Sequence, residues 1–418
     1  MAPHVLVAPA CARFSPEAAS ESGWIYDIVT GVATRCPDFR FTCLVAESAP
    51  ELPMQIRVAA LGSWRADALG GLALPWRISA AARPALRAGE FDLVHHGLPF
   101  AAGRSFSIVG TQAVRRGIPL VLGPVQTPLE WTGADEHGGT LNGQCASRLR
   151  TGALALAQRL YPLVAPGLSS LSLQTMRRAS RIVAISPAAR RLLIEAGVDP
   201  GRVEVVPPPV RMAQIGVAAW PRPAPALRLL TAGYLIERKG VVGMAKIVST
   251  MAARGVPVVL DIAGDGPAAA MVKTAADQFG GGNAVHVHGW LGRQQLSDLY
   301  SSAHVYVSMS KAESWGHAVA DALAAGLVAV SADNVGARAM VELGAPLRLV
   351  PVDGWVQLGQ VLLELAKTDV ARLRLEGSAG VGWAAETLGL PVIADRWSKV
   401  YREALAATGQ RSRVRSLP

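Results

Sequence analysis

The chain has 418 residues, of which 50% are hydrophobic and 17% are charged. This composition excludes a disordered chain, and the length predicts two domains of roughly 200 residues each. A formal net charge of +10 favours an anionic partner, such as a nucleotide phosphate, a membrane surface or nucleic acid.

The cysteines and the N-terminus indicate the compartment. Cys11, Cys36, Cys43 and Cys145 lack zinc-like spacing, so we expect free thiols in a reducing cytosol. The opening MAPHVLVAPA lacks a basic segment followed by a long apolar stretch, and therefore predicts a first strand instead of a signal peptide. No uninterrupted apolar run reaches the roughly 20 residues that a membrane-spanning helix needs. These features favour a cytoplasmic protein, and the heavy use of Ala, Arg, Gly and Pro suggests a GC-rich bacterial genome.

Short aliphatic runs alternate with helical patterns along the whole chain. In chain order, the first half contains HVLVAPA, FTCLVAE, FDLVHH, PLVLGPV, RIVAIS and VEVVPPP. The second half contains LRLLTAGYL, VPVVLDIAGDG, AVHVHGWL, VYVSMS and LVAVSA. Such apolar strands, separated by helices, predict parallel sheets that are covered on both faces. We therefore expect two doubly wound α/β domains.

A proline-rich stretch marks the predicted domain boundary. VVPPPV, residues 205–210, favours an extended linker, because proline continues neither a helix nor a central strand. We expect a first domain over residues 1–207, a second over 208–390, and a final helix with a basic tail over 391–418. No strand follows this helix, which either caps the second domain or crosses back to the first.

Ligands of parallel sheets bind at the carboxyl ends of the strands, so the turns after strands are candidate sites. In GYLIERKG, residues 233–240, Arg238 and Lys239 directly precede a predicted helix. Cations beside the N–H groups of a helix start attract phosphate. An exposed basic turn is an equally good interpretation of this motif alone.

Two further turns carry weaker signals. LDIAGDGP, residues 260–267, is more typical of a tight turn than of a ligand contact. In VHVHGWLG, residues 285–292, His286 and His288 alternate along a strand and face the same side. No third metal ligand is near them in the sequence, so a metal site is not favoured.

The fourth turn places two carboxylates around one helix start. VYVSMSKAESWGHAVADALAAG predicts a strand that ends at Ser308, a loop to Gly316, and a helix after it. Glu313 and Asp321 are eight positions apart, which is close enough to flank one bound molecule. The alternatives are a helix cap for Glu313 and a satisfied buried carboxylate for Asp321.

The order of these motifs resembles a known family. The series G-x-L-x-x-x-K-G, G-D-G-P, H-G-W-L and E-x7-D, followed by ALAAGLVAVSADNVGA, is similar to the second domain of retaining glycosyltransferases of family four. The resemblance extends upstream through RASRIVAISPAARRLLIEAGVDPGRVEVVPPPV, FDLVHHGLPF and GIPLVLGPVQTP. It implies the GT-B fold, in which two Rossmann-like domains face a central cleft and bind the acceptor and the nucleotide-sugar donor respectively.

The resemblance also implies roles for individual residues. Lys239 and Glu313 would be catalytic, with Lys239 on the donor diphosphate and Glu313 on the hydroxyls of the transferred sugar. Asp321 would accept the ribose hydroxyls. The remaining donor contacts would come from Gly23, Tyr234, Arg238, Leu291, Arg293 and the backbone amides of Gly316, His317, Ala318 and Val319.

The sequence departs from the family pattern at three places. Asp321 stands where glutamate is usual, and Tyr234 replaces an arginine that would contact the diphosphate. The usual histidine after the fourth strand of the first domain is missing. This leaves Gln126, together with His95 and His96, as candidate acceptor contacts. The sequence has no D-x-D motif at these strand ends, so we expect neither a metal nor another cofactor.

The expected reaction is retaining transfer of a sugar from a GDP- or UDP-sugar to O, N or S of a small polar acceptor, in natural-product or antibiotic biosynthesis. One alternative is a peripheral membrane enzyme that builds a lipid-linked or envelope glycan, supported by the positive charge and by the basic, apolar region 148–181. Another is a non-catalytic nucleotide-sugar-binding protein. Nucleic-acid binding is not favoured, because no basic patch is interleaved with aromatics. The oligomeric state is left open.

Overall fold

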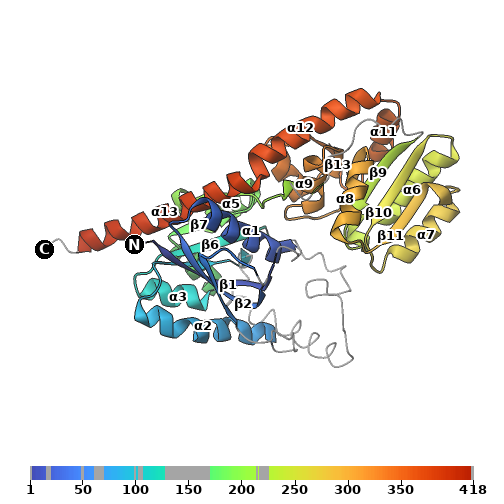
Figure 1. The fold of residues 1–418 in the computed structure, drawn as a ribbon. Coiled ribbons are helices and arrows are strands. Elements are labelled where there is room, and N and C mark those ends of the chain that lie inside the picture. Colours follow the sequence, from blue (N-terminus) through green and yellow to red (C-terminus); the bar gives the residue numbers. More distant parts are fainter. Residues whose placement is uncertain are drawn as a thin grey trace. The chain divides into compact units, whose positions relative to one another are not determined.

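The computed structural model describes residues 2–15, 20–48, 51–60, 70–97, 100–101, 107–127, 170–212, 215 and 226–415. The chain forms two compact units, Met1–Pro209 with Leu390–Pro418, and Val210–Gly389. Each unit contains one parallel sheet with helices around it (Figure 1). The predicted pair of parallel α/β domains is therefore confirmed.

The sheet of the first unit has the order β3-β2-β1-β4-β6-β7-β8, with β5 beside β6. Neighbouring strands are parallel throughout. The strands are β1 (His4–Phe14), β2 (Arg40–Ser48), β3 (Ile56–Ala60), β4 (Leu93–His96), β5 (Phe100–Ala101), β6 (Leu120–Gln126), β7 (Arg181–Ala184) and β8 (Val203–Val205). The order reverses between β1 and β4, so the ligand edge of this unit lies at their carboxyl ends.

Two layers of helices cover the first sheet. One layer, formed by α2 (Gly70–Ala88), α3 (Ile108–Arg115), a helix over 170–178 and α5 (Pro187–Glu195), packs its apolar side chains on the strands in one cluster. The other layer contains α1 (Ser20–Arg35) and α13 (Leu390–Arg415), which contact each other. Ser107 and Ser186 begin α3 and α5 by accepting backbone N–H bonds at 3.0 and 3.1 Å, the usual role of serine before a helix.

The last helix, α13, belongs to the first unit. The Tyr401 hydroxyl donates to His95 Nδ1 at 2.9 Å, and Trp397 and Tyr401 are almost fully buried. Ion pairs join Arg35 to Asp395 at 2.7 Å and Arg181 to Glu403 at 3.0 Å. Part of one face of the first sheet is thus covered by a helix whose residues follow the second unit in the sequence.

The sheet of the second unit has the order β11-β10-β9-β12-β13-β14, and its neighbouring strands are parallel. Its strands are β9 (Leu227–Ala232), β10 (Val258–Ala263), β11 (Val285–Gly289), β12 (Val305–Ser308), β13 (Val328–Ala332) and β14 (Leu347–Val350). The order reverses between β9 and β12. In such sheets the ligand crevice lies at the carboxyl ends of the two diverging strands.

The helices of the second unit also cover both faces of their sheet. α6 (Val241–Ala253), α7 (Ala269–Gln278) and α11 (Trp355–Ala366) pack into one apolar cluster with the strands. The remaining helices are α8 (Arg293–Ser302), α9 (His317–Ala324), α10 (Val335–Glu342) and α12 (Val370–Leu388). α12 packs along α9 and β13.

The structure also bears on the expectations for the cysteines and for a membrane-spanning helix. Cys36 and Cys43 are buried free thiols, as expected, whereas Cys145 lies outside the described residues. Most of region 148–181 also lies outside them. Among the described helices, none combines the length and apolar character that crossing a bilayer requires.

Candidate functional site

The candidate site lies where β9 and β12 separate. Tyr306, on β12, bridges the two strands: its hydroxyl accepts from Ala232 N–H at 3.1 Å and donates to Ala232 O at 3.2 Å. Tyr306 is buried, and this burial raises the pKa of its hydroxyl, so the hydroxyl stays protonated at neutral pH. The loops that leave these strands, 233–240 and 309–316, therefore start from fixed points.

The two loops bring the predicted catalytic side chains together. Lys239 Nζ is ion-paired with Glu313 Oε1. Arg238 Nη1 lies 3.9 Å from the same oxygen and donates to Ser310 Oγ at 3.3 Å and to the Ala312 carbonyl. Lys239 and Glu313 are 27% and 18% exposed, so a ligand can reach both. The cation and the carboxylate thus meet, although 74 residues separate them in the sequence.

Glycines fix the approach of these loops. Lys239 ends a 3₁₀ turn, η3 (Glu237–Lys239), and Gly240 follows with φ +69°. A Cβ at Gly240 would lie 2.7 Å from Met309 O, on the loop from β12. Only glycine permits both this conformation and this contact. In the LDIAGDGP turn, Leu235 N–H donates to Asp265 O at 2.9 Å, so that turn supports the Lys239 loop.

The start of α9 lies in the same loop as Glu313. Gly316, with φ +97°, precedes the first helical residue, His317. The N–H groups of Val319 and Ala320 both donate to Gly316 O, at 3.0 and 3.2 Å. Of the four predicted phosphate-binding amides, that of Val319 is therefore engaged within the helix. Burial lowers the pKa of His317 to about 4, with Glu313 opposing and Lys239 reinforcing this effect, so the ring is neutral at pH 7.

Asp321 lies one turn further along α9, in a less polar environment. Burial raises the pKa of its carboxyl group to about 7, while the positive charges of Arg211 and Arg293 act in the opposite direction. Arg293, predicted as a donor contact, begins α8 two residues after the partly buried Leu291. Arg211 was not predicted. It directly follows the proline linker, and no local motif distinguishes it from other surface arginines.

The start of α11 holds both loops of the site. Lys311 Nζ pairs with Asp353 at 3.0 Å, and Lys311 N–H donates to Arg238 O at 2.9 Å. The indole of Trp355 packs against α6, where a Cβ at Gly243 would lie 2.4 Å from its ring. No local sequence pattern indicates this support, because Trp355 lies more than 100 residues after Lys239.

Comparison with known families decides the class of protein. The family described as "Glycosyl transferase 4-like domain" matches residues 18–209, and the family "Glycosyl transferases group 1" matches residues 218–379. The chain belongs to the family-four glycosyltransferases. Together the two matches span most of both units, as the sequence resemblance implied.

Solved structures share the fold of this glycosyltransferase at low sequence identity. Sucrose-phosphate synthase of Thermosynechococcus elongatus has a TM-score of 0.66 and 15% identity, covering 97% of this chain and 100% of the other. A glycosyltransferase of Rickettsia africae has a TM-score of 0.62 and 14% identity, covering 96% of this chain and 98% of the other. Anabaena HepE in complex with UDP has a TM-score of 0.60 and 15% identity, covering 96% of this chain and 99% of the other. These neighbours confirm the GT-B fold. Comparison with curated protein sequences gave no match.

The predicted acceptor contacts of the glycosyltransferase require a correction. His95 is fully buried: its Nε2 donates to Gly123 O at 2.9 Å and its Nδ1 accepts from Tyr401. Nδ1 thus anchors α13 and Nε2 joins β4 to β6, so both ring nitrogens are engaged in the interior, and the prediction that His95 contacts an acceptor was wrong. His96 is 6% exposed, and burial lowers its pKa to about 3, so it too belongs to the interior. Gln126, partly buried at the end of β6, stays a prediction.

Gly23, predicted as a donor contact, lies in the first turn of α1 and is buried, and its role stays a prediction. Residues 16–19, which precede α1, lie outside the described part of the chain. Tyr234, in contrast, is 49% exposed at the end of β9 and accessible to a ligand.

One of the two histidines of β11, His288, has a structural partner. His288 Nε2 bonds Asp261 Oδ1 at 2.8 Å, and Arg228 bonds the other oxygen of this buried carboxylate at 2.9 Å. Across the described ranges, His, Cys, Asp and Glu side chains nowhere gather in groups of three that could hold a metal ion. His288 thus joins adjacent strands.

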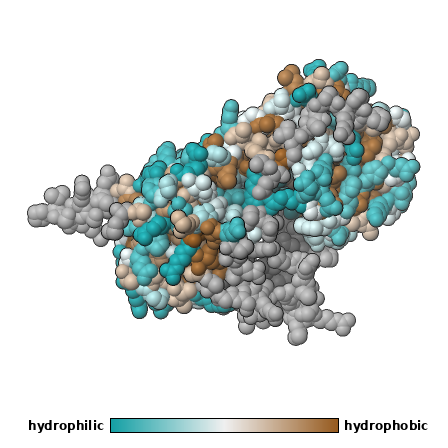
Figure 2. Space-filling view, in the orientation of Figure 1, coloured by the Kyte–Doolittle hydropathy of each residue, from teal (hydrophilic) through white to brown (hydrophobic). Residues whose placement is uncertain are grey.

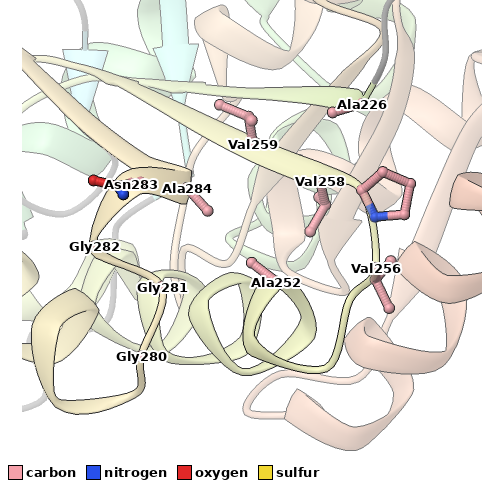
Figure 3. A pocket seen from close by; sticks show the side chains of 11 residues that line it. Ala226, Ala252, Val256, Val258, Val259, Gly280, Gly281, Gly282, Asn283 and Ala284 are labelled. Carbon is pink, nitrogen blue, oxygen red and sulfur yellow. The ribbon is translucent and has the colours of Figure 1, made fainter.

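A pocket of about 470 Å³ opens at the opposite edge of the second sheet. It lies before the first residues of β9, β10 and β11, and Figure 3 shows its lining of small apolar side chains and glycines, with Asn283 as a polar side chain. Ligands of parallel sheets bind at the carboxyl edge, so this pocket is not the donor site.

Proposed function

We propose that the enzyme transfers a sugar from a nucleoside diphosphate sugar to an acceptor hydroxyl, amine or thiol, with retention at the anomeric carbon. The observation that carries the proposal is the Lys239–Glu313 pair at the carboxyl ends of β9 and β12, directly before the N-terminus of α9. At the point where the strand order reverses, the cation and the N-terminus of the helix can bind the diphosphate of such a donor. The carboxylate can bind the hydroxyls of its sugar.

Each part of the donor has a candidate partner in this arrangement. The ammonium group of Lys239 would balance the diphosphate, and the N–H groups that begin α9 would add to this charge. Glu313, which Lys239 and Arg238 hold in the loop, would accept hydrogen bonds from the sugar hydroxyls. Asp321, two turns after Glu313, would accept those of the ribose. Leu291 and Arg293 would lie on the side of the base.

The proposed chemical step needs no protein nucleophile. The bond between the anomeric carbon and the β-phosphate oxygen breaks, and the acceptor atom forms its new bond on the same face of the sugar. The acceptor proton passes to the departing phosphate. Lys239 and the N–H groups of the helix stabilise the negative charge that develops on the leaving group, an effect worth about 3 to 4 kcal/mol for a single well-placed donor. The proposal assigns no part of this stabilisation to a metal ion.

The donor and the acceptor are open to direct test. Anabaena HepE has been crystallised with UDP and with UDP-glucose, which makes UDP the first nucleotide to test and GDP the second. For the acceptor, a small polar metabolite of a natural-product pathway is the first candidate. A lipid-linked acceptor at a membrane surface is the second, and it is favoured by the arginine-rich surface described below.

The experiment measures the melting temperature of the purified enzyme with UDP, GDP, TDP and ADP in turn. A ligand that binds only the folded state raises this temperature by mass action. We expect one nucleotide to produce a selective shift that Lys239→Met reduces. The control, Lys273→Met, removes an exposed lysine of α7 and should keep the shift. If no nucleotide shifts the wild type, the donor assignment fails.

A further inference from the structure

The outer surface of the first unit carries a group of exposed arginines. Neither α2 nor α3 contains an acidic residue. We define the arginine face as the exposed side chains of these helices and of the residue after α3: Trp76, Arg77, Arg83, Arg87, Arg115 and Arg116. The same helical layer also contains Arg177, Arg178, Arg190 and Arg191. Most of this layer therefore presents positive charge to its surroundings.

The arginine face differs from several other charged surfaces of the enzyme. Some arginines elsewhere are joined to carboxylates, as in the pairs Arg35–Asp395 and Arg338–Asp333. Within the described part of the chain, Arg83, Arg87 and Arg115 form no ion pair. Uncompensated like charges on adjacent helices repel each other, so they favour an anionic partner that neutralises them together.

The helix geometry aligns these side chains. Ile78, Ala82 and Leu86 face the core, which leaves positions 76, 80, 83 and 87 of α2 in one stripe on the opposite side. Trp76, 64% exposed, lies in this stripe with Arg83 and Arg87. The helices α2 and α3 run side by side, and Gln112 Nε2 donates to Ser79 Oγ at 2.7 Å (Figure 1).

An anionic lipid surface fits this pattern better than nucleic acid does. Arginines near such a surface bind its headgroups, and an exposed tryptophan is typical of the interface between water and lipid. Leu171 and Leu192, 46% and 40% exposed, add apolar groups to the same helical layer. Figure 2 shows the visible side of the first unit as a mixture of hydrophilic and hydrophobic side chains. Single-stranded nucleic acid requires several stacking aromatics, whereas α2 and α3 expose only Trp76.

We propose that the arginine face docks the enzyme on a membrane surface that contains anionic phospholipids. The buried side of α2 stays packed on the sheet, so docking is electrostatic, with Trp76 reaching the headgroup region. The proposal does not depend on the donor. If docking is found, the acceptor or the product lies at the bilayer, and the lipid-linked acceptor moves ahead of the small polar metabolite.

Sedimentation with lipid vesicles tests the proposal. The full-length enzyme is mixed with vesicles of phosphatidylcholine alone, or of phosphatidylcholine with one quarter phosphatidylglycerol, at low and at high salt. We expect binding to the second kind only, and we expect salt to weaken it. Each arginine at such a surface strengthens partitioning about 5-fold, so Arg83→Glu with Arg87→Glu should weaken it by about 25-fold or more.

Matched variants separate docking from a general effect of charge. Arg372→Glu with Arg374→Glu makes the same charge change at exposed positions of α12 and should alter partitioning less than two-fold. Trp76→Ser should weaken binding several-fold, whereas Leu375→Ser, at a 73% exposed site, should not. All variants should keep the wild-type melting temperature and its shift with nucleotide.

Three results would overturn the proposal. The wild type could remain in the supernatant with both kinds of vesicle. The α12 variant could lose as much binding as the α2 variant, which would show that net charge alone is responsible. Duplex DNA could displace the enzyme from vesicles at equal charge concentration while binding it more tightly, which would assign the face to nucleic acid. A nucleotide shift that persists in any of these cases would leave the donor assignment intact.

Discussion

Replacement of Asp321 by asparagine should stabilise the enzyme while weakening its binding of nucleotide. Burial raises the pKa of Asp321 from 3.8 to about 7, so the folded protein holds its proton more tightly than the unfolded chain does. Below about pH 4 both states are protonated and the shift has no effect on stability. As pH rises towards 7, the unfolded chain ionises first, and the wild type becomes progressively less stable. Above about pH 7 the loss is constant.

The size of this effect follows from the two pKa values. Their separation corresponds to about 4 kcal/mol of unfolding free energy. Part of the Asp321 side chain is accessible to water, which recovers some of this cost, so we expect about 2 to 4 kcal/mol. Asparagine has nearly the same shape and no ionisable group. The variant should therefore gain this stability at about pH 8 and little of it at about pH 4.

Scanning calorimetry at the two pH values measures the gain, which should raise the transition of the second unit by about 5 to 10 °C at the higher pH. Asp298→Asn, at an exposed position of α8, is the control and should change neither transition. In the same samples, nucleotide should bind the Asp321 variant about 10- to 100-fold more weakly, because a charge-assisted hydrogen bond contributes about 1.5 to 3 kcal/mol. An equal change in melting temperature at both pH values would refute the electrostatic reasoning.

Three further predictions concern the supports of the site and of the fold. Glu313→Gln should reduce sugar transfer about 100-fold or more while nucleotide affinity stays near that of the wild type, and an unchanged transfer rate would remove Glu313 from the sugar site. Trp355→Ala should lower both the melting temperature and the turnover number, because it releases the loops of the site. The control Val356→Ala, at a 71% exposed neighbouring position, should change neither, and equal kinetics for the two variants would contradict the role of Trp355. Tyr401→Phe removes the partner of His95 Nδ1 and should reduce the free energy of unfolding by about 1 to 3 kcal/mol in urea titrations without changing nucleotide affinity, and a loss of affinity would mean that the His95 cluster does more than pack the helix.

The parts of the structure that follow from local sequence were predictable. Apolar runs gave the strands, and Ser308 and Gly316 marked the end of β12 and the start of α9 at the positions where the structure has them. The family resemblance assigned Lys239 and Glu313 to the same donor, and the structure brings them together because β9 and β12 are adjacent strands. Their chemical roles stay predictions.

The failures concern residues whose partners are distant in the sequence. The local sequence around His95 does not indicate whether its side chain faces a cleft or the core. Its burial depends on Tyr401, which lies 306 positions later in the sequence. Arg211 acts on Asp321 only after the linker has folded back to α9. Trp355 supports the Lys239 loop through glycines whose missing Cβ atoms make room for an indole. No periodicity or motif encodes such long-range contacts.

The placement of α13 in the first unit has a consequence for synthesis on the ribosome. Residues between Pro209 and Leu390, which form the other unit, must emerge before Tyr401 can cover His95. At about 5 to 20 residues per second this interval lasts roughly 10 to 40 s. During that time the apolar surface that α13 covers in the finished fold is exposed to solvent and to chaperones, while the second unit can fold as an uninterrupted segment. The earliest strands of the chain are thus among the last parts to become fully native.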